Sequence, residues 1–404
     1  MKKTEGWVTA PQGFLAAGVK AGIKASGNHD VAVIFSTVPA ACGAVFTQNK
    51  MCAAPVLVSR EVNKHGYAQA IAVNSGCANA CTGEQGLADA KKMQAHTAEL
   101  LGIAPEAVFV CSTGVIGQFL PMDKLLTGIA DAVDSLDECE GESCAMAIQT
   151  TDTFIKHAAY ETEIGGKKVT FAGIAKGAGM IHPNMCTMLS FVTTDAAIAQ
   201  PLLLEALQAD VCDTYNMISV DGDTSTNDTC LLLANGMAEN PVISEKNEDY
   251  DRFCEALRTV NEYLAKQMAG DGEGATALCE VKVIGAETKE QAKIISKSVI
   301  TSNLTKAAIY GHDANWGRIL CAMGYSGAQF DPEKVDLFFE SAAGKMQIIK
   351  DGVALDYSEE EATKILSEPE VTAIADIKMG TAEATAWGCD LTYDYVKINA
   401  DYRS

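Results

Sequence analysis

The chain has 404 residues, enough for a large buried core and for two domains or lobes. Hydrophobic residues make up 48% and charged residues 21% of it, as in an ordinary globular protein, and the formal net charge is -22. This excess of negative charge argues against binding to nucleic acid, whose phosphates require Lys and Arg, and against binding to an anionic membrane surface.

Strands and a helix alternate in the first part of the sequence. Residues 30–35 (DVAVIF) and 70–74 (AIAVN) are short apolar runs that predict buried strands. Residues 82–85 (Thr-Gly-Glu-Gln) form a capping box, in which side chains satisfy the free backbone N–H groups at the start of a helix. Apolar residues at helical spacing follow it, and we expect the helix to end at Gly102.

Residues 108–111 predict a further strand, which runs into a turn at Thr113 and Gly114. A hydroxyl and a backbone N–H in such a turn can point at one position, which is the arrangement that stabilises the oxyanion of acyl transfer. A plain turn, with Gly for backbone freedom, explains the same two residues without any function.

The segment 176–195 (KGAGMIHPNMCTMLSFVTTD) changes from a loop to a strand at Thr187. Glycines, a proline and an asparagine predict the loop, and the alternation of Leu189 and Phe191 with smaller residues predicts the strand. A rigid strand holds a nucleophilic hydroxyl in place, while the loop before it can be strained or removed. Thr187 is therefore a candidate nucleophile, although a β-former at the start of a strand is the simpler interpretation.

A threonine hydroxyl needs a base before it can act as a nucleophile. Cleavage of the Cys186–Thr187 bond supplies one, because it creates an α-amine in the same residue as the hydroxyl, with an ordinary pKa of about 7.7–8.0. None of the histidines has a partner at metal-ligand spacing, and none is assigned as the base. His182, which is near this bond in the sequence, is expected to have a role in the loop.

The second half of the sequence also mixes helices and strands. An apolar stripe predicts a long helix that ends at Gly270, with Phe253, Leu257, Val260, Leu264 and Met268 on one face. Residues 279–283 alternate as in a half-buried strand, and residues 288–291 (Thr-Lys-Glu-Gln) form a second capping box. Residues 391–398 predict a last strand, followed by a polar tail. This order indicates layered sheets covered by helices.

Metal sites and disulfides are not expected. The 14 cysteines are scattered along a chain too long to need a disulfide framework, and Cys77 and Cys81 lack a second pair of ligands at zinc-site spacing. Asp221 and Asp223 offer oxygen ligands for magnesium or calcium, but Thr226 stands where an EF-hand loop requires Gly. We favour a hydrogen-bonded turn. A metal- or ligand-binding protein built on these acids is the alternative from another functional class.

The N-terminus carries two lysines without an apolar segment behind them, so no signal peptide is expected. No apolar run approaches the roughly 20 residues of a membrane-spanning helix. We therefore expect a cytoplasmic protein.

Residues 176–189 (KGAGMIHPNMCTML) closely resemble the self-cleavage segment of the glutamate N-acetyltransferase, or ornithine acetyltransferase, family of arginine biosynthesis. The family usually has Ala before the threonine, where this sequence has Cys186. Further blocks resemble the family in the same order and extend over essentially the whole chain: NSGCANACTGEQGLADA, CSTGVIG, TTDTF, VDGDTSTNDT, DGEGAT, YGHDANWGRI and INADYRS.

The resemblance implies an α/β fold of the self-cleaving N-terminal-nucleophile type, a layered αββα sandwich with two lobes. It also implies cleavage between Cys186 and Thr187 into fragments 1–186 and 187–404. The first fragment carries the oxyanion turn, the substrate lysine and the cleavage loop, and the second begins at the nucleophile.

The resemblance assigns roles to individual residues. It makes Thr113 and Gly114 the oxyanion-stabilising pair, and its substrate contacts match Thr150, Lys176, Thr187, Glu273, Asn399 and Ser404. An isolated Lys is usually a solvated surface charge, but Lys176 suits the α-carboxylate of an amino acid. Thr150 also fits a helix cap, and Glu273 an acidic turn. The glycines beside Glu273 allow its backbone to approach a ligand closely.

The implied reaction is a ping-pong transfer of acetyl from N-acetylornithine to glutamate through an ester on Thr187, without a metal or organic cofactor. The family contains members with and without acetyl-CoA as a second donor, and both remain open here. It suggests a heterotetramer of cleaved chains. The nearest alternative is a self-processing aminopeptidase or amidase of similar fold and nucleophile.

Overall fold

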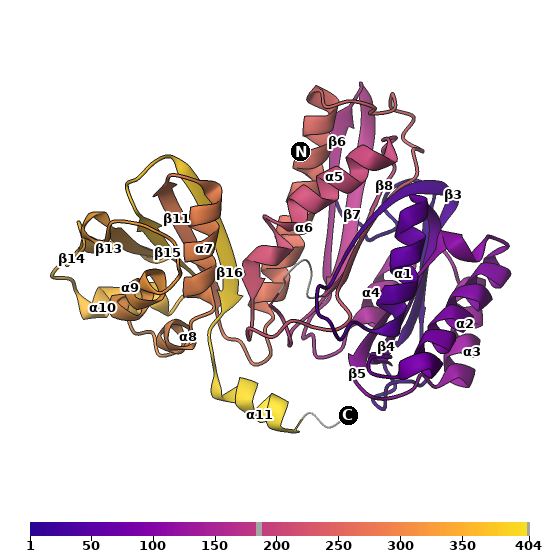
Figure 1. Ribbon diagram of the computed structural model, residues 1–404, viewed down its shortest axis with the longest axis horizontal. Helices are drawn as coiled ribbons and strands as arrows, with labels where there is room; N and C mark the ends of the chain where they lie inside the picture. Colours follow the sequence, from indigo (N-terminus) through magenta and orange to yellow (C-terminus); the bar gives the residue numbers. More distant parts are fainter. Residues whose placement is uncertain (183–187, 402–404) are drawn as a thin grey trace. The chain divides into compact units, whose positions relative to one another are not determined.

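A computed structural model describes residues 1–182 and 188–401 of the chain (Figure 1). The chain divides into two compact units that interleave along the sequence. The first unit takes its described residues from Met1–Gly177, Pro183–Asn216 and Thr224–Leu264. The second takes them from Ala178–His182, Met217–Asp223 and Ala265–Ser404. Among the described residues, no helix is both long and apolar enough to cross a membrane.

The described residues of the first unit form a nine-stranded mixed sheet in the order β1-β6-β7-β8-β10-β3-β4-β5, with β2 also paired to β3. Pairs β4–β5 and β8–β10 are parallel, and the other pairs are antiparallel. The strands are β1 (Lys2–Lys3), β2 (Phe14–Val19), β3 (Val31–Phe46), β4 (Tyr67–Cys77), β5 (Val108–Val115), β6 (Lys156–Ile164), β7 (Lys167–Lys176), β8 (Leu189–Thr194) and β10 (Thr229–Ala234).

The long strand β3 joins two groups of strands. Its first part pairs with β2 and β4, and its last part pairs with β10. Adjacent residues of β3 point to opposite faces, as the alternation of side chains along a strand requires. Ile34 packs in one core with Ile174 of β7 and Phe191 of β8, while Val33 packs in another with Met93 and Leu125 of two helices. The two groups of strands therefore share a core between them.

Helices pack on these strands. They are α1 (Ala54–His65), α2 (Gly83–Leu101), α3 (Met122–Asp134), α4 (Gly141–Ile148), α5 (Gln200–Val211) and most of α6 (Glu248–Gly270), with the short 3-10 helices η1 (Pro105–Ala107) and η2 (Tyr215–Met217). α4 contributes Cys144 and Ile148 to the core between the two groups of strands, and other helices cover the outer faces. α2 and α3 pack on β3 to β5. On the opposite side of the two groups of strands, α6 packs on β7, where the ring centroids of Phe253 and Phe171 lie 5.1 Å apart. This helix–sheet–sheet–helix order confirms the predicted α/β layers (Figure 1).

The described residues of the second unit form a seven-stranded sheet in the order β14-β13-β12-β15-β11-β16-β9. Its strands are β9 (Ile218–Ser219), β11 (Leu278–Ala286), β12 (Asp336–Ser341), β13 (Gly344–Lys350), β14 (Val353–Ala354), β15 (Glu370–Asp376) and β16 (Ala382–Cys389). Its helices are α7 (Lys289–Ile300), α8 (Asn303–Tyr310), α9 (Trp316–Gly324), α10 (Glu359–Leu366) and α11 (Tyr393–Asp401), with the 3-10 helix η3 (Pro332–Lys334).

Most elements predicted from local patterns are confirmed. All five residues of the predicted stripe of α6 are buried, and Gly102 ends α2 in the left-handed conformation. Thr288 caps α7 by accepting the backbone N–H of Gln291 at 3.1 Å. The predicted capping box at the start of α2 is wrong, because the Thr82 hydroxyl donates to Asn79 Oδ1 at 2.7 Å instead of accepting from the helix.

The last predicted strand is also wrong, because residues 393–401 form the helix α11. The aromatic and β-branched residues of this stretch favour strands, which led to the error. The hydroxyl of Thr392 accepts the backbone N–H of Tyr395 at 3.2 Å and donates to the carbonyl of Gly274 at 2.8 Å. Thr392 thus caps α11 by accepting a backbone N–H group at the start of the helix. A capping threonine at this position is the feature of the sequence that indicates a helix, although the apolar residues after it favour a strand.

Candidate functional site

The expected site residues belong to both units. In the first unit lie Thr113, Gly114, Thr150 and Lys176. In the second lie Glu273 and Asn399. Outside the described residues lie Cys186, Thr187 and Ser404.

Thr113 and Gly114 lie in the last part of β5, so the turn predicted at these residues is wrong. The parallel pairing of β5 with β4 shifts register at Gly76 and Cys77, opposite Gly114. Gly114 has a φ of +130°, and a Cβ atom on it would lie 2.4 Å from the carbonyl carbon of Gly76. Both its conformation and this close approach therefore require glycine at position 114.

Two buried asparagines hold the residue before Thr113. The Ser112 hydroxyl donates to Asn74 Oδ1 at 2.6 Å. The Asn227 amide donates to the carbonyl oxygens of Ser112 and Ala78 at 2.8 Å and 2.6 Å. Sequence reasoning missed both asparagines, which lie in the family-like blocks NSGC and STND, because a local pattern does not show which distant backbone an amide will hold.

Lys176 ends β7, and its side chain reaches Thr113. It is 7% exposed, and its Nζ donates to Thr113 Oγ1 at 3.3 Å across 63 residues of sequence. The alternative of a solvated surface charge is therefore excluded. Lys176 is also paired in the sheet with Leu189 of β8, which is two residues after Thr187 in the sequence. An ammonium group only donates, so the Thr113 hydroxyl keeps its own hydrogen for another acceptor.

Asp152 organises the backbone around Thr150 and Lys176. Its carboxylate accepts the N–H of Thr150 at 3.0 Å, the N–H of Gly177 at 2.7 Å and the ammonium of Lys156 at 2.6 Å. Burial by itself would raise the pKa of Asp152, but the charges of Lys156 and Lys176 and these hydrogen bonds outweigh it and lower the pKa to about 2. Sequence reasoning missed Asp152, although it stands in the family-like block TTDTF.

In the second unit, Glu273 and Asn399 contact each other. The Asn399 amide donates to Glu273 Oε2 at 2.7 Å, and Glu273 is 9% exposed. A Cβ atom on Gly179 would lie 2.4 Å from the Glu273 carboxyl carbon, so a side chain at position 179 would displace this carboxylate. The glycine after Glu273 allows a close approach within the protein, since a Cβ there would lie 2.7 Å from the Tyr395 nitrogen.

The acidic residue Asp221 holds the loop before the expected cleavage segment. Its carboxylate accepts the backbone N–H groups of Met180 at 2.6 Å and Ile181 at 2.9 Å, and the hydroxyl of Tyr395 at 3.2 Å. Burial and the charge of Asp221 raise the pKa of Tyr395. These contacts fit the favoured interpretation of a hydrogen-bonded turn, because backbone and hydroxyl donors occupy the oxygens that a metal ion would need.

His182 is the last described residue before the expected cleavage segment. Its Nδ1 lies 3.1 Å from the Ser219 hydroxyl. Burial, helped by the charge of Lys297, lowers the pKa of His182 to about 4, so its imidazole is neutral at physiological pH. The contact with Ser219 is compatible with the expected loop role, which stays a prediction.

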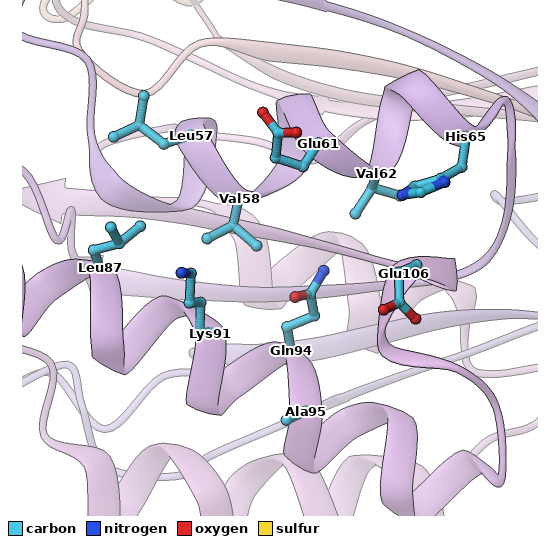
Figure 2. Close-up of a pocket in the computed structure, with 10 residues that line it drawn as sticks. All are labelled: Leu57, Val58, Glu61, Val62, His65, Leu87, Lys91, Gln94, Ala95 and Glu106. Atoms are coloured by element: carbon cyan, nitrogen blue, oxygen red, sulfur yellow. The ribbon is translucent and has the colours of Figure 1, made fainter.

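Two hollows of the first unit differ in their relation to the site. A polar pocket of about 400 Å³ is lined by Thr150 and Asp152 together with Lys20, Lys24 and His29. A larger groove of about 500 Å³ lies between α1 and α2, where Leu57, Val58 and Val62 of α1 and Leu87 of α2 supply apolar lining beside Lys91 and Glu106 (Figure 2). None of the expected site residues that the structure describes lines this second groove.

Comparison with known proteins gives consistent matches. A model of the ArgJ family matches residues 15–404. The arginine biosynthesis bifunctional protein ArgJ of Caldanaerobacter subterraneus subsp. tengcongensis is 52% identical to this chain over 404 residues, which is 100% of both. The protein of the same name from Symbiobacterium thermophilum is 53% identical over 406 residues, again 100% of both chains.

A solved structure agrees with these matches. The crystal structure of the arginine biosynthesis bifunctional protein ArgJ from Bacillus halodurans superimposes with a TM-score of 0.51 at 48% sequence identity. The match covers 54% of this chain and 100% of the solved chain. The solved chain is therefore similar to about half of the sequence.

Proposed function

Since this chain belongs to the ArgJ family, we propose that it is an acetyltransferase of arginine biosynthesis, which moves the acetyl group of N2-acetylornithine to the amine of glutamate. The names of the full-length relatives place those proteins in arginine biosynthesis. They are also named bifunctional, so the proposal includes acetyl-CoA as a second acetyl donor for glutamate.

The first step of the proposal is self-cleavage. One water molecule is added across the Cys186–Thr187 peptide bond, which leaves a carboxylate on Cys186 and a free amine on Thr187. A length observation supports this step. The solved Bacillus halodurans chain is matched in full by 54% of this chain, and residues 187–404 make up the same share of the 404-residue sequence.

Acetyl transfer follows in two halves. The Thr187 hydroxyl attacks the acetyl carbonyl of N-acetylornithine and passes its proton to the α-amine of the same residue. That proton then goes to the departing ornithine amine, and an acetyl ester remains on Thr187. The amine of glutamate attacks the ester, and the proton lost from this amine returns to the threonine oxygen. The ester keeps the acetyl group activated, provided that water is excluded.

The observation that carries the proposal is the contact between Thr113 and Lys176. Packing of the two groups of strands brings these family-matched residues to 3.3 Å, beside the start of β8. In the proposal, the Thr113 hydroxyl and the Gly114 N–H hold the oxyanion, and Lys176 binds a carboxylate of the substrate. Thr150, Glu273, Asn399 and Ser404 complete the substrate contacts, with Glu273 facing an ammonium group.

The test compares wild-type protein with Thr187→Ala in N-acetylornithine, with and without glutamate. We expect wild-type protein to convert glutamate to N-acetylglutamate and to release one ornithine for each acetyl group moved, while the variant does neither. Acetate released at the same rate without glutamate would identify a hydrolase instead. Wild-type protein that remains one uncut chain of 42.6 kDa yet is fully active would rule out the amine of Thr187 as the base.

A further inference from the structure

The polar pocket beside Thr150, which we call the Lys24 pocket, is lined by several basic residues in an otherwise acidic protein. Lys20, Lys24 and His29 line it, with Asp152 as an acidic neighbour. The carboxylate of Asp152 is already engaged by Lys156 and two backbone N–H groups. In a chain with a net charge of -22, this pocket therefore offers basic groups to a ligand.

The basic groups of the Lys24 pocket act on one another. Partial burial lowers the pKa of His29, and the charges of Lys20 and Lys24 lower it further. Burial lowers the pKa of Lys24 to about 8, with Asp30 opposing this effect and Lys176 adding to it. An anion placed among these groups would relieve their repulsion and raise the pKa of Lys24.

The loop that carries Lys24 is held in place without a ligand. Both carboxylate oxygens of the buried Asp30 accept backbone N–H groups, those of Ala21 at 2.7 Å and Lys24 at 2.9 Å. Lys124 donates to the carbonyl of Gly22 at 2.7 Å. The Lys24 ammonium donates one of its three hydrogens to the His29 carbonyl at 2.6 Å, which leaves two for a ligand. The site is therefore preorganised.

Lys24 is close to the expected oxyanion residues. A Cβ atom on Gly76 would lie 3.2 Å from Lys24 Cγ, so the lysine stem packs over Gly76. Gly76 is paired in turn with Gly114 of β5. Thr150, which lines the pocket, is among the family-matched substrate contacts. A substrate held at Thr150 thus has the Lys24 pocket within reach.

We propose that the Lys24 pocket binds an anionic oxygen group of a substrate, with Lys24 as its main cation. This inference rests on the proposed function, in which the protein must distinguish the side chain of glutamate from that of ornithine. Ornithine and glutamate share the α-amino acid part and differ at the end of the side chain, which is an ammonium in one and a carboxylate in the other. A cation near the site selects the carboxylate. The phosphates of acetyl-CoA carry the same chemistry, and they are the second possible source.

The test uses cleaved protein with Lys24→Gln, Lys24→Arg and the control Lys92→Gln, which changes an exposed lysine of α2. We expect Lys24→Gln to raise the KM for glutamate by roughly ten- to a hundredfold, as for loss of a charged hydrogen bond, with a smaller change in kcat. Its preference for glutamate over glutamine as acceptor should fall by a similar factor. Lys24→Arg should recover most of the preference, and Lys92→Gln should match wild-type protein.

A second experiment tests whether the anionic group is instead a phosphate of acetyl-CoA. If phosphate is the ligand, Lys24→Gln raises the KM for acetyl-CoA but not for acetyl-pantetheine, which lacks the adenosine and all the phosphates of coenzyme A, and leaves the glutamate preference unchanged. The inference is overturned if Lys24→Gln changes neither the preference for glutamate over glutamine nor the ratio of the KM values for acetyl-CoA and acetyl-pantetheine. Calorimetric titration of glutamate and glutamine into wild-type protein and Lys24→Gln measures the same preference without turnover. A protein that binds glutamate through Lys24 but transfers no acetyl group would contradict the proposed function and leave the pocket assignment standing.

Discussion

Thr113 shows how the chemistry of one side chain depends on its neighbour. Its hydroxyl oxygen accepts from the Lys176 ammonium, so its hydrogen is available to a developing oxyanion. The adjacent Gly114 has a backbone conformation that other residues rarely adopt. The two proposed oxyanion donors are therefore held in place by the protein itself, and preorganised donors of this kind would act mainly on the transition state.

Thr113→Ala is expected to lower the turnover number by roughly 10²–10³-fold, the usual cost of removing one oxyanion donor. The KM for N-acetylornithine should change much less, because the oxyanion exists only during reaction. Steady-state kinetics on fully cleaved protein measures both, since cleavage also passes through a tetrahedral oxyanion. Thr113→Ser, which keeps the hydroxyl, is the matched control. An unchanged turnover number in Thr113→Ala would mean that this hydroxyl has only a structural role.

Asp152 is a positioning residue whose protonation is coupled to stability. Its pKa in the folded protein is about 2, below the ordinary value of 3.8. A depressed carboxyl pKa stabilises the folded state at pH values above the unfolded pKa, and this stabilisation is lost as the pH falls through the folded pKa. The shift corresponds to about 2 kcal/mol at neutral pH.

Asp152→Asn should therefore lower the free energy of unfolding by about 3–5 kcal/mol at pH 7, because it leaves the buried ammonium of Lys156 without its carboxylate. The difference from the parent should narrow by about 2 kcal/mol as the pH falls from 4 toward 2. Urea unfolding at pH 7, 4, 3 and 2 measures this difference in the free energy of unfolding, with Thr187→Ala as parent so that the chain stays in one piece. Asp134→Asn, at an exposed position of α3, is the control. A difference that does not depend on pH would refute the coupling.

At the scale of elements, the sheet of the first unit joins strands from both sides of the proposed cleavage site. β7 and β3 precede Thr187 in the sequence, whereas β8 and β10 follow it. The order β7-β8-β10-β3 places the two later strands between the two earlier ones. Cleavage at Cys186–Thr187 would therefore leave two strand interfaces between fragments, β7 with β8 and β10 with β3.

The helix α11 connects the C-terminal tail to Glu273. Its residue Asn399 is exposed but donates to the Glu273 carboxylate, and its start is held by Thr392. No side chain of α11 is buried, so few apolar contacts hold this helix. Such an end is usually frayed and dispensable. The contact with a family-matched carboxylate favours a role in covering bound substrate instead.

Deletion of residues 399–404 tests this role. Cleavage at Thr187 should be unaffected, because it needs no substrate. The KM for N-acetylornithine should rise, and the ratio of acetate released to acetyl transferred should rise as well, since water would reach the Thr187 ester. Both products are measured in one assay, and Asn399→Ala separates the loss of this amide from the loss of the tail. Normal transfer and normal partitioning in the truncated protein would make the tail an ordinary terminus.

At the scale of the whole molecule, the compact units and the proposed fragments are different divisions of the chain. The first unit draws residues from both sides of Thr187 and has a core shared by β3, β4, β7, β8 and β10. Separation of fragments 1–186 and 187–404 would expose this core to water, at a cost that grows with the apolar area involved. The fragments should therefore behave as one folded protein.

Wild-type protein should give two bands under denaturing electrophoresis but a single species under native conditions, separable only by denaturant. Native mass spectrometry should show an intact mass of about 42.6 kDa or, for the proposed heterotetramer, about twice that value. Thr187→Ala should have the same native mass and one denatured band. Elution of the two fragments at different volumes without denaturant would contradict a shared core.

The sequence by itself determined the elements whose signals are local and, through its resemblance over the whole chain, the family and the candidate residues. The stripe of α6 and the end of α2 at Gly102 depend on neighbours a few residues apart, so a pattern reveals them. Only the tertiary structure decided that Lys176 is buried against Thr113 and that Asp152 holds the segments on either side of it. Those contacts depend on which strands pair and which layers pack, and residues 63 positions apart share no local pattern that could predict them.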